Sequence, residues 1–380
     1  MTFHYLLEGP EEAPVLLFCN SLGTSAGMWQ PQRDALIGQY RILRYDVPGH
    51  GDSAPNGQTR SLETLGAAVL SLLDELAVGK VHFCGISMGG LIGLWLARFH
   101  PQRLITLTVA NSAAKIGEPA AWQQRADQVR QHGMAAVAAG AAARWFTPAF
   151  CERAPATVQT LLTQLRSCDA ESYADCCDAL AEADLRHELA AIHLPVLVIA
   201  GRDDEVTTVA DAEALVAQIQ GAQLAVLPAS HLSSVEMWLA FNRALQSFLA
   251  AQLTQHQRYQ QGMTVRRAVL GETHVDRTLE NLSPLNEEFQ HFISRYAWGE
   301  IWTRPGLARH TRSLITIGML IALNREAELK MHLKAAFNNG VTRDEIKEVL
   351  MHAALYCGLP ASNAAFHLAQ AVFDEQDNAR

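Results

Sequence analysis

Lys80-Val-His-Phe-Cys-Gly-Ile-Ser-Met-Gly-Gly90 is the stretch that decides the fold of the first part of the chain. Its apolar run, 81–84, is typical of a buried β-strand, and an apolar segment with helical spacing follows over 91–99. Between them, Ser87 stands in a Gly-x-Ser-x-Gly pattern. A serine on a turn this sharp needs glycines on both sides, because a Cβ atom there would clash. The stretch therefore predicts a strand, a tight turn that exposes a nucleophilic serine, and a helix whose positive end faces developing negative charge.

The segments on either side of this stretch alternate between strand and helix patterns. Six apolar, β-prone runs are expected to form strands, at 15–19, 41–46, 81–84, 104–110, 195–200 and 223–227. Between and after them, helical periodicity predicts helices at 61–77, 91–99, 209–219 and 235–253. Such alternation is typical of a mostly parallel α/β sheet.

One region, about 115–190, breaks this alternation. It is rich in Ala and Gln, has a helical pattern and contains no convincing strand. A helical insertion after a strand of an α/β sheet is expected to cover the site as a cap. The first domain is therefore predicted to be residues 1–253, with this cap inside it.

A second, all-helical domain is expected over 265–380, after a polar linker at 254–264. Helical patterns follow at 283–298, 308–323, 326–339 and 342–357. Within them, Gly340 is expected to terminate a helix, and Thr342-Arg-Asp-Glu345 to form a capping box at the start of the next.

Composition excludes several classes of protein. A chain of 380 residues with 49% hydrophobic and 18% charged residues is globular and long enough for two domains. Its net charge of −9 argues against nucleic acid as a partner. Seven scattered cysteines form neither a disulfide framework nor a zinc pattern, and no apolar run reaches the roughly 18 residues of a membrane span. With no signal peptide recognisable, we expect a cytoplasmic protein with no bound metal.

The partners of Ser87 are expected in the order serine, acid, histidine. Asp203 and Asp204 follow the strand at 195–200, and the spacing Gly-x-x-Asp favours Asp204. His231 follows the last strand and is the expected base. All of these positions lie at the carboxyl ends of strands, where open α/β sheets bind ligands. Two backbone N–H groups, of Leu22 and Met88, are expected to form the oxyanion hole.

Three motifs of the first domain resemble those of the 3-oxoadipate enol-lactonases, over residues 1–253. They are Asn20-Ser-Leu-Gly23, Asp46-Val-Pro-Gly-His-Gly-Asp-Ser53 and Gly85-Ile-Ser-Met-Gly-Gly90. The resemblance implies an α/β hydrolase fold and hydrolysis of an enol-lactone that carries an acetate side chain. A cation should hold that carboxylate, and Arg144 in the cap is the first candidate, with Arg125 and Arg130 behind it.

The second domain resembles the 4-carboxymuconolactone decarboxylases throughout. The resemblance rests on segments that begin at Arg295, Arg309, Leu329 and His352, namely Arg295-Tyr-Ala-Trp-Gly-Glu-Ile-Trp302, Arg309-His-Thr-Arg-Ser-Leu-Ile-Thr316, Leu329-Lys-Met-His-Leu-Lys-Ala-Ala336 and His352-Ala-Ala-Leu-Tyr-Cys-Gly-Leu-Pro360. It implies the helical fold shared with alkylhydroperoxidases. Those peroxidases carry Cys-x-x-Cys four residues before a histidine, whereas here the two positions hold Arg325 and Glu328, which excludes a dithiol redox role.

The second resemblance also implies the site residues of a cofactor-free decarboxylase. His332 is the expected acid that protonates a dienolate, and Glu328, one helical turn before it, is expected to orient the imidazole and raise its pKa. His352 is the alternative acid. Arg309 and Arg312 are candidates to bind the substrate carboxylates. Two tryptophans at i, i+4 spacing, Trp298 and Trp302, are expected to belong to the core.

Together the resemblances imply a bifunctional enzyme of the protocatechuate branch of the β-ketoadipate pathway. It would convert 4-carboxymuconolactone to 3-oxoadipate through the enol-lactone, without a cofactor, and would assemble as a homo-oligomer through the C-terminal domain. The alternative is a generic esterase or perhydrolase whose helical domain serves only oligomerisation.

Overall fold

The computed structural model describes residues 3–57, 60–304 and 306–378. The chain divides into two compact units, Met1–Leu249 and Ala250–Arg380. The first unit is an α/β unit with a helical cap, and the second is entirely helical in its described residues. The fold class expected from the sequence is therefore confirmed.

A seven-stranded sheet forms the centre of the first unit. The strand order is β1-β3-β2-β4-β5-β6-β7, and all neighbours are parallel except β1 and β3. The strands are β1 (Tyr5–Glu8), β2 (Val15–Cys19), β3 (Arg41–Tyr45), β4 (Val81–Ile86), β5 (Leu104–Ala110), β6 (Val196–Gly201) and β7 (Gln223–Leu227). Only β1 was not predicted. It is only four residues long and lies partly exposed at the sheet edge, and a run this short has no recognisable periodicity.

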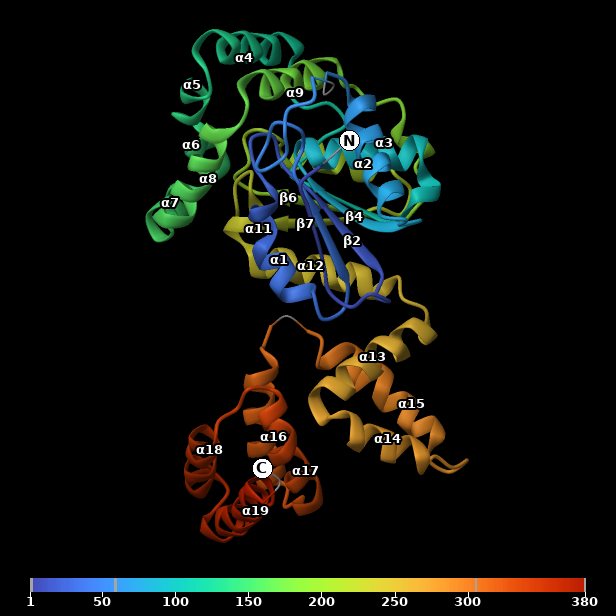
Figure 1. Ribbon diagram of the computed structural model, residues 1–380, viewed down its shortest axis with the longest axis vertical. Coiled ribbons are helices and arrows are strands. Elements are labelled where there is room, and N and C mark those ends of the chain that lie inside the picture. Colours follow the sequence, from blue (N-terminus) through green and yellow to red (C-terminus); the bar gives the residue numbers. More distant parts are fainter. Residues whose placement is uncertain (1–2, 58–59, 305, 379–380) are drawn as a thin grey trace. The chain divides into compact units, whose positions relative to one another are not determined.

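Helices cover both faces of the sheet, with α1 and α12 on one face and α2 and α3 on the other (Figure 1). The helix predicted at 235–253 is in fact interrupted at Met237. The helices outside the cap are α1 (Gln30–Leu36), α2 (Leu62–Glu75), α3 (Met88–Phe99), α10 (Val209–Gln218), α11 (Ser233–Glu236) and α12 (Trp238–Ala251), with short 3-10 turns η1 (Ala26–Trp29), η2 (Pro101–Arg103) and η3 (Leu189–Ala191). All side chains of β4 are buried, as expected for a central parallel strand.

Six helices form the cap between β5 and β6, as the sequence predicted, and appear in teal and green in Figure 1. Arg60, ahead of α2, and Arg130 of the cap both contact Asp175, whose side chain is 1% exposed. The Arg60 pair joins the cap to the sheet region, and the Arg130 pair joins two helices of the cap. The cap helices are α4 (Pro119–His132), α5 (Ala135–Ala138), α6 (Ala141–Trp145), α7 (Pro148–Arg153), α8 (Pro155–Ser167) and α9 (Ala170–Glu182).

The second unit begins with a helix where a linker was predicted. Residues 255–264 belong to α13 (Gln255–Leu270), and Thr254 caps it through a capping box with Gln257. The polar linker expected at 254–264 is therefore helical from Gln255 onward, because the capping box and the packing of α13 outweigh the polar composition. The other helices are α14 (Glu272–Glu280), α15 (Glu287–Ile293), the π-helix η4 (Ser294–Ile301), α16 (Arg309–Ala322), α17 (Glu326–Asn338), α18 (Arg343–Tyr356) and α19 (Leu359–Asp377).

Two local features predicted from the sequence of this unit, a helix end and a capping box, are confirmed. Gly340 follows α17 with φ +78°, and Thr342 and Glu345 form the predicted capping box of α18. Helices α16 to α19 enclose one apolar core, to which Ile317 and Leu333 contribute. A smaller core between α13 and η4 contains Trp298, as predicted.

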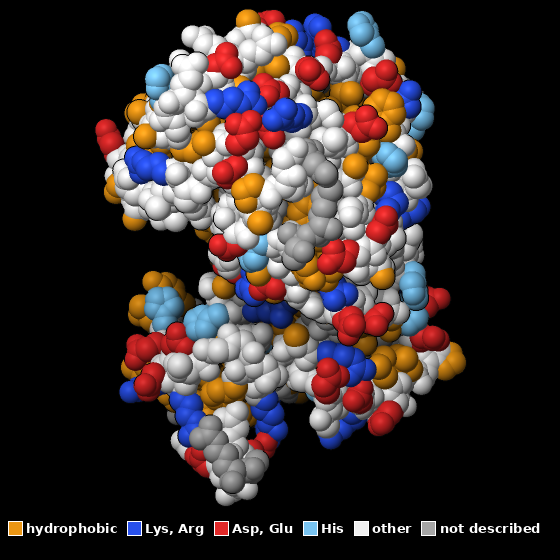
Figure 2. Space-filling model, turned by 45° about the horizontal axis from the view of Figure 1, so that its top comes forward, with side chains coloured by type: hydrophobic (Ala, Val, Ile, Leu, Met, Phe, Trp, Pro, Cys, Tyr) orange, Lys and Arg blue, Asp and Glu red, His pale blue; other side chains and the backbone are white. Residues whose placement is uncertain are grey.

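The surface carries charges of both signs. Figure 2 shows acidic and basic side chains interspersed over the visible face rather than gathered by sign. None of the helices in the described part of the chain combines the length and apolar character that a membrane crossing requires.

Candidate functional sites

The turn between β4 and α3 has the strained geometry that the Gly-x-Ser-x-Gly pattern predicted. Ser87 has φ 56° and ψ −120°, a conformation that L-residues rarely adopt. A Cβ atom on Gly85 would overlap the carbonyl of Gly89, and one on Gly89 would overlap the carbonyl of Cys19. The turn thus holds the serine side chain at the carboxyl edge of the sheet, where it lines a cavity.

An aspartate and a histidine meet beside this serine. His231 Nδ1 lies 2.9 Å from Asp204 Oδ2 and 3.1 Å from Oδ1, and both side chains are buried. Asp203 is exposed, so the carboxylate that faces the histidine is that of Asp204. His231 lines the same cavity as Ser87.

Two residues that the sequence analysis did not identify hold Asp204 in place. The side-chain amide of Asn111 donates to Asp204 Oδ2 at 3.0 Å, and the Thr207 hydroxyl donates to the same oxygen at 2.8 Å. Burial alone would raise the pKa of Asp204, but hydrogen bonds from His231, Asn111 and Thr207 lower it below its ordinary value. Asn111 directly follows β5, so the rule that ligands gather at carboxyl ends of strands could have indicated it.

The loop after β2 carries Leu22, the second residue predicted to donate to the oxyanion. Leu22 lines the cavity, and Met88 is the first residue of α3, so its N–H has no partner within the helix. Asn20 fixes this loop: its amide donates to Tyr45 O at 2.8 Å and accepts from Trp29 Nε1 at 2.9 Å.

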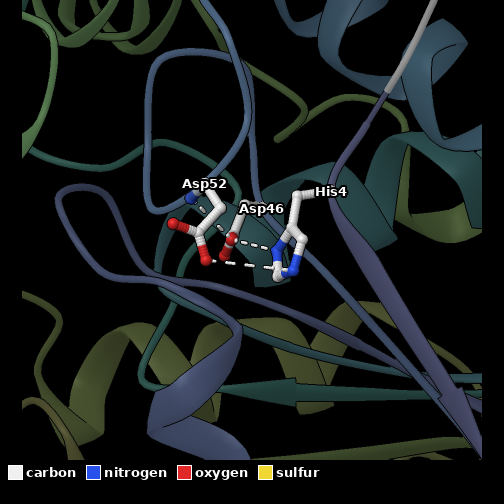
Figure 3. A group of neighbouring side chains, drawn as sticks. All are labelled: His4, Asp46 and Asp52. Atoms are coloured by element: carbon white, nitrogen blue, oxygen red, sulfur yellow. Dashed lines mark hydrogen bonds and ion pairs between the residues drawn. The ribbon is translucent and has the colours of Figure 1, made fainter.

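Asp46, with His4 and Asp52, forms a group whose side chains are of the metal-binding type (Figure 3). Protein donors occupy the Asp46 carboxylate, however. Its Oδ1 accepts from the Ala26 N–H at 2.6 Å, and its Oδ2 contacts His4 Nδ1 at 2.8 Å and the Asp52 N–H at 3.1 Å. Asp46 therefore connects the end of β3 to the loop that carries Leu22.

The cavity beside Ser87 has a volume of about 270 Å³ and lies under the cap. Of the three cap arginines considered, Arg144 and Arg125 line it, and neither forms an ion pair within residues 3–57, 60–304 and 306–378. Burial and the charge of Arg125 lower the pKa of Arg144. Arg130 instead pairs with acidic residues of α9 and does not line the cavity. The cavity therefore presents two cations beside a buried serine.

In the second unit, His332 lies on α17 against the ring of Trp302, with ring centroids 6.5 Å apart and planes nearly parallel. Burial, with a smaller effect from His274, lowers its pKa to about 4. Glu328 is exposed and acts in the opposite direction, but its effect is the weakest of the three. Glu328 thus acts in the expected direction, but the raised pKa expected for His332 does not result, because desolvation of the imidazole outweighs the effect of a solvated carboxylate.

The alternative acid, His352, lies on an exposed apolar face. Its ring is 4.8 Å from that of Tyr356, and both line a groove that also includes Met351 and Cys357. His352 and His332 therefore occupy different environments, one exposed and one half-buried.

The two arginines predicted to bind substrate lie toward the other end of the α16–α17 pair. Asn339, just after α17, contacts Ser313 of α16 at 3.0 Å. Seven residues separate His332 from Asn339, which is about 10 Å along the helix at 1.5 Å per residue. Arg309 precedes Ser313 and therefore lies on the other side of this contact from His332. Burial lowers the pKa of both Arg309 and Arg312. No hydrogen bond or ion pair between described residues joins either arginine to His332.

Comparison with known proteins identifies the family of each unit. The family model "Alpha/beta hydrolase family" matches residues 16–244, and "Carboxymuconolactone decarboxylase family" matches residues 287–371. The first part of the chain is 48% identical over 250 residues to 3-oxoadipate enol-lactonase 2 of Acinetobacter baylyi, covering 66% of this chain and 93% of the relative. The second part is 63% identical over 123 residues to 4-carboxymuconolactone decarboxylase of the same organism, covering 32% and 92%.

Among solved structures, the enol-lactonase of Burkholderia xenovorans matches the first unit. The TM-score is 0.64 at 40% identity, covering 65% of this chain and 96% of that one. The chain is thus a fusion: its first unit belongs to the alpha/beta hydrolase family and its second to the carboxymuconolactone decarboxylase family.

Proposed function

We propose that the chain is a bifunctional enzyme that decarboxylates 4-carboxymuconolactone and then hydrolyses the resulting 3-oxoadipate enol-lactone to 3-oxoadipate. One observation carries the proposal: a single chain is similar, in consecutive units, to a 3-oxoadipate enol-lactonase and to a 4-carboxymuconolactone decarboxylase. The product of decarboxylation is the substrate of hydrolysis, so the two reactions are consecutive steps of the protocatechuate branch.

In the first unit, Ser87 Oγ attacks the lactone carbonyl while His231 takes its proton, and Asp204 orients the imidazole. The oxyanion accepts hydrogen bonds from the N–H groups of Leu22 and Met88, each worth roughly 10²–10³ in rate. Collapse breaks the ring C–O bond and expels an enol, which receives the proton from His231 and ketonises. Water then hydrolyses the acyl-enzyme through the same groups.

Arg144, assisted by Arg125, holds the acetate carboxylate of the lactone. The support is their position in the cavity of Ser87 and the absence of a carboxylate partner among the described residues. Arg144→Met should raise the KM for enol-lactone at least about tenfold, since a hydrogen bond to a charged group contributes about 1.5–3 kcal/mol. Arg153→Met, elsewhere in the cap, is the matched control and should leave the KM within about twofold.

In the second unit, the ring C–CO₂ bond breaks and its electron pair moves through the C=C bond to the lactone carbonyl oxygen, giving a dienolate that is protonated at carbon. His332 donates that proton. Because its pKa is about 4 in the free protein, it must gain a proton as the dianionic substrate binds, and nearby negative charge favours this. Glu328, Arg309 and Arg312 remain candidates for orienting the imidazole and for binding the carboxylates.

The test supplies 4-carboxymuconolactone to the full chain and follows CO₂ release and ring opening separately. Ser87→Ala should abolish ring opening and leave CO₂ release intact, whereas His332→Gln should abolish CO₂ release and leave the hydrolysis of separately supplied enol-lactone intact. If folded His332→Gln releases CO₂ normally and His352→Gln does not, the proton donor is His352. Hydrolysis of a simple aryl ester far faster than of enol-lactone would instead favour the esterase alternative.

We also propose that the second unit assembles with copies of itself. On α18 and α19, Leu355, Tyr356 and Leu359 are 77%, 73% and 75% exposed, more than a monomer normally leaves in one patch. Light scattering should give a multiple of 41.6 kDa. Leu355→Glu should reduce that mass, and a monomeric wild-type chain would contradict the assembly.

A further inference from the structure

Arg266, on α13, is a buried arginine without a counter-ion. Its side chain is 5% exposed, and no carboxylate lies within ion-pair distance of it among the residues that the structure describes. Nη1 donates to Ser294 Oγ at 3.3 Å and Nη2 to Gln290 Oε1 at 2.9 Å, while Nε has no hydrogen-bond partner. Removing a guanidinium from water is unfavourable unless an anion compensates its charge.

Arg44 of the first unit provides the comparison. It is equally buried, at 3% exposure, but its Nη2 lies 2.6 Å from the carboxylate of Glu8. The fold therefore compensates one buried arginine with a carboxylate and leaves the other uncompensated. An uncompensated buried cation is a common feature of sites that bind an anionic ligand.

Arg266 also lies near the candidate proton donor. Burial lowers the pKa of His274 of α14, with smaller effects from Arg266 and Arg277, and burial followed by His274 lowers the pKa of His332 of α17. Trp302 stacks on His332 and contacts Trp298, which packs in the same small core as the neighbours of Arg266 on α13. Helices α13, α14, η4 and α17 thus bring a buried cation, two imidazoles and two tryptophan rings into one region.

We propose that Arg266 binds the carboxylate of the lactone substrate that decarboxylation leaves in place. This inference rests on the decarboxylase activity proposed above. The retained carboxylate stays anionic throughout the reaction. An ion pair with it therefore stabilises the ground state and the transition state equally and does not slow the step. The departing carboxylate loses its charge, so an equally strong ion pair there would stabilise the ground state and slow the step.

The experiment measures decarboxylation by the full chain with two substrates: 4-carboxymuconolactone and its analogue methylated on the acetate carboxylate. Wild type should show a KM at least about tenfold higher for the ester. In Arg266→Met this ratio should fall toward one, because the variant has lost the partner of the carboxylate. A merely structural arginine would change both KM values by the same factor. Hydrolysis of supplied enol-lactone by the first unit measures the concentration of active chains, and the calorimetric transition of the second unit shows whether the variant is folded there.

Arg266→Lys covers the case in which the methionine variant fails to fold, because it keeps the charge with fewer donors; its ratio should lie between those of wild type and one. An unchanged ratio in a folded Arg266 variant would overturn the inference, as would transfer of the effect to Arg309→Met or Arg312→Met. If wild type released no CO₂ from 4-carboxymuconolactone, the proposed function itself would fail.

Discussion

The strained turn at Ser87 allows a prediction that separates stability from activity. Both Ser87→Gly and Ser87→Ala remove the nucleophile, so both should abolish lactone hydrolysis. Only glycine relieves the backbone strain at φ 56° and ψ −120°, because alanine retains the Cβ atom. The difference in unfolding free energy between the two variants therefore isolates the strain.

The size of that difference follows from three contributions. A non-glycine residue in such a region costs up to about 3 kcal/mol. Glycine loses about 0.8 kcal/mol for the missing buried methyl group of alanine. The glycine variant loses about 0.5–1 kcal/mol more, because glycine gives the unfolded chain greater conformational freedom than alanine does. Ser87→Gly should therefore be more stable than Ser87→Ala by up to about 1.5 kcal/mol, and each kcal/mol corresponds to roughly 2–4 °C in Tm for a unit of this size.

Differential scanning calorimetry of the full-length variants measures the shift. The transition of the first unit should move and that of the second should not, and CO₂ release should equal that of wild type in both variants. A Ser87→Gly chain no more stable than Ser87→Ala would refute the reasoning, because the turn would then store no strain against a Cβ atom.

Further predictions concern the acid, the buried histidine and a helix cap. Asp204→Asn should lower kcat for hydrolysis about 10⁴-fold, whereas Asp203→Asn should change it less than about threefold. Burial lowers the pKa of His332 from 6.5 to about 4, so between these pH values only the unfolded chain binds the proton. The urea midpoint of the second unit should fall as pH drops through that window, and His332→Gln should make it fall less. Thr342→Ala should cost the same unit about 1 kcal/mol, measured by urea unfolding, and an unchanged midpoint would deny the capping box a role.

Much of the first site was readable from the sequence because its chemistry depends on local constraints. Gly85 and Gly89 are required by the turn itself, and that turn fixes Ser87 in place whatever surrounds it. The order of acid and histidine follows from the parallel strands, whose carboxyl ends meet at one edge. The capping box at Thr342 is likewise contained within four residues.

The remaining features depend on neighbours that are distant in sequence. Asn111, more than ninety residues earlier in the chain, holds Asp204 in place through its side-chain amide. No periodicity predicts such a pairing, because it is made by side chains from different strands.

The properties of the second candidate site depended on tertiary structure even more than those of the first. A carboxylate one turn away led the sequence analysis to expect a raised pKa for His332, yet burial against Trp302 lowers it. Arg266 carried no signal in the sequence, since an arginine on a polar helix is normally solvated. Spacing along the chain determines which groups can be neighbours on one element. Burial and the pairing of charges are set only when separate elements pack together, and these decided the electrostatics of the second site.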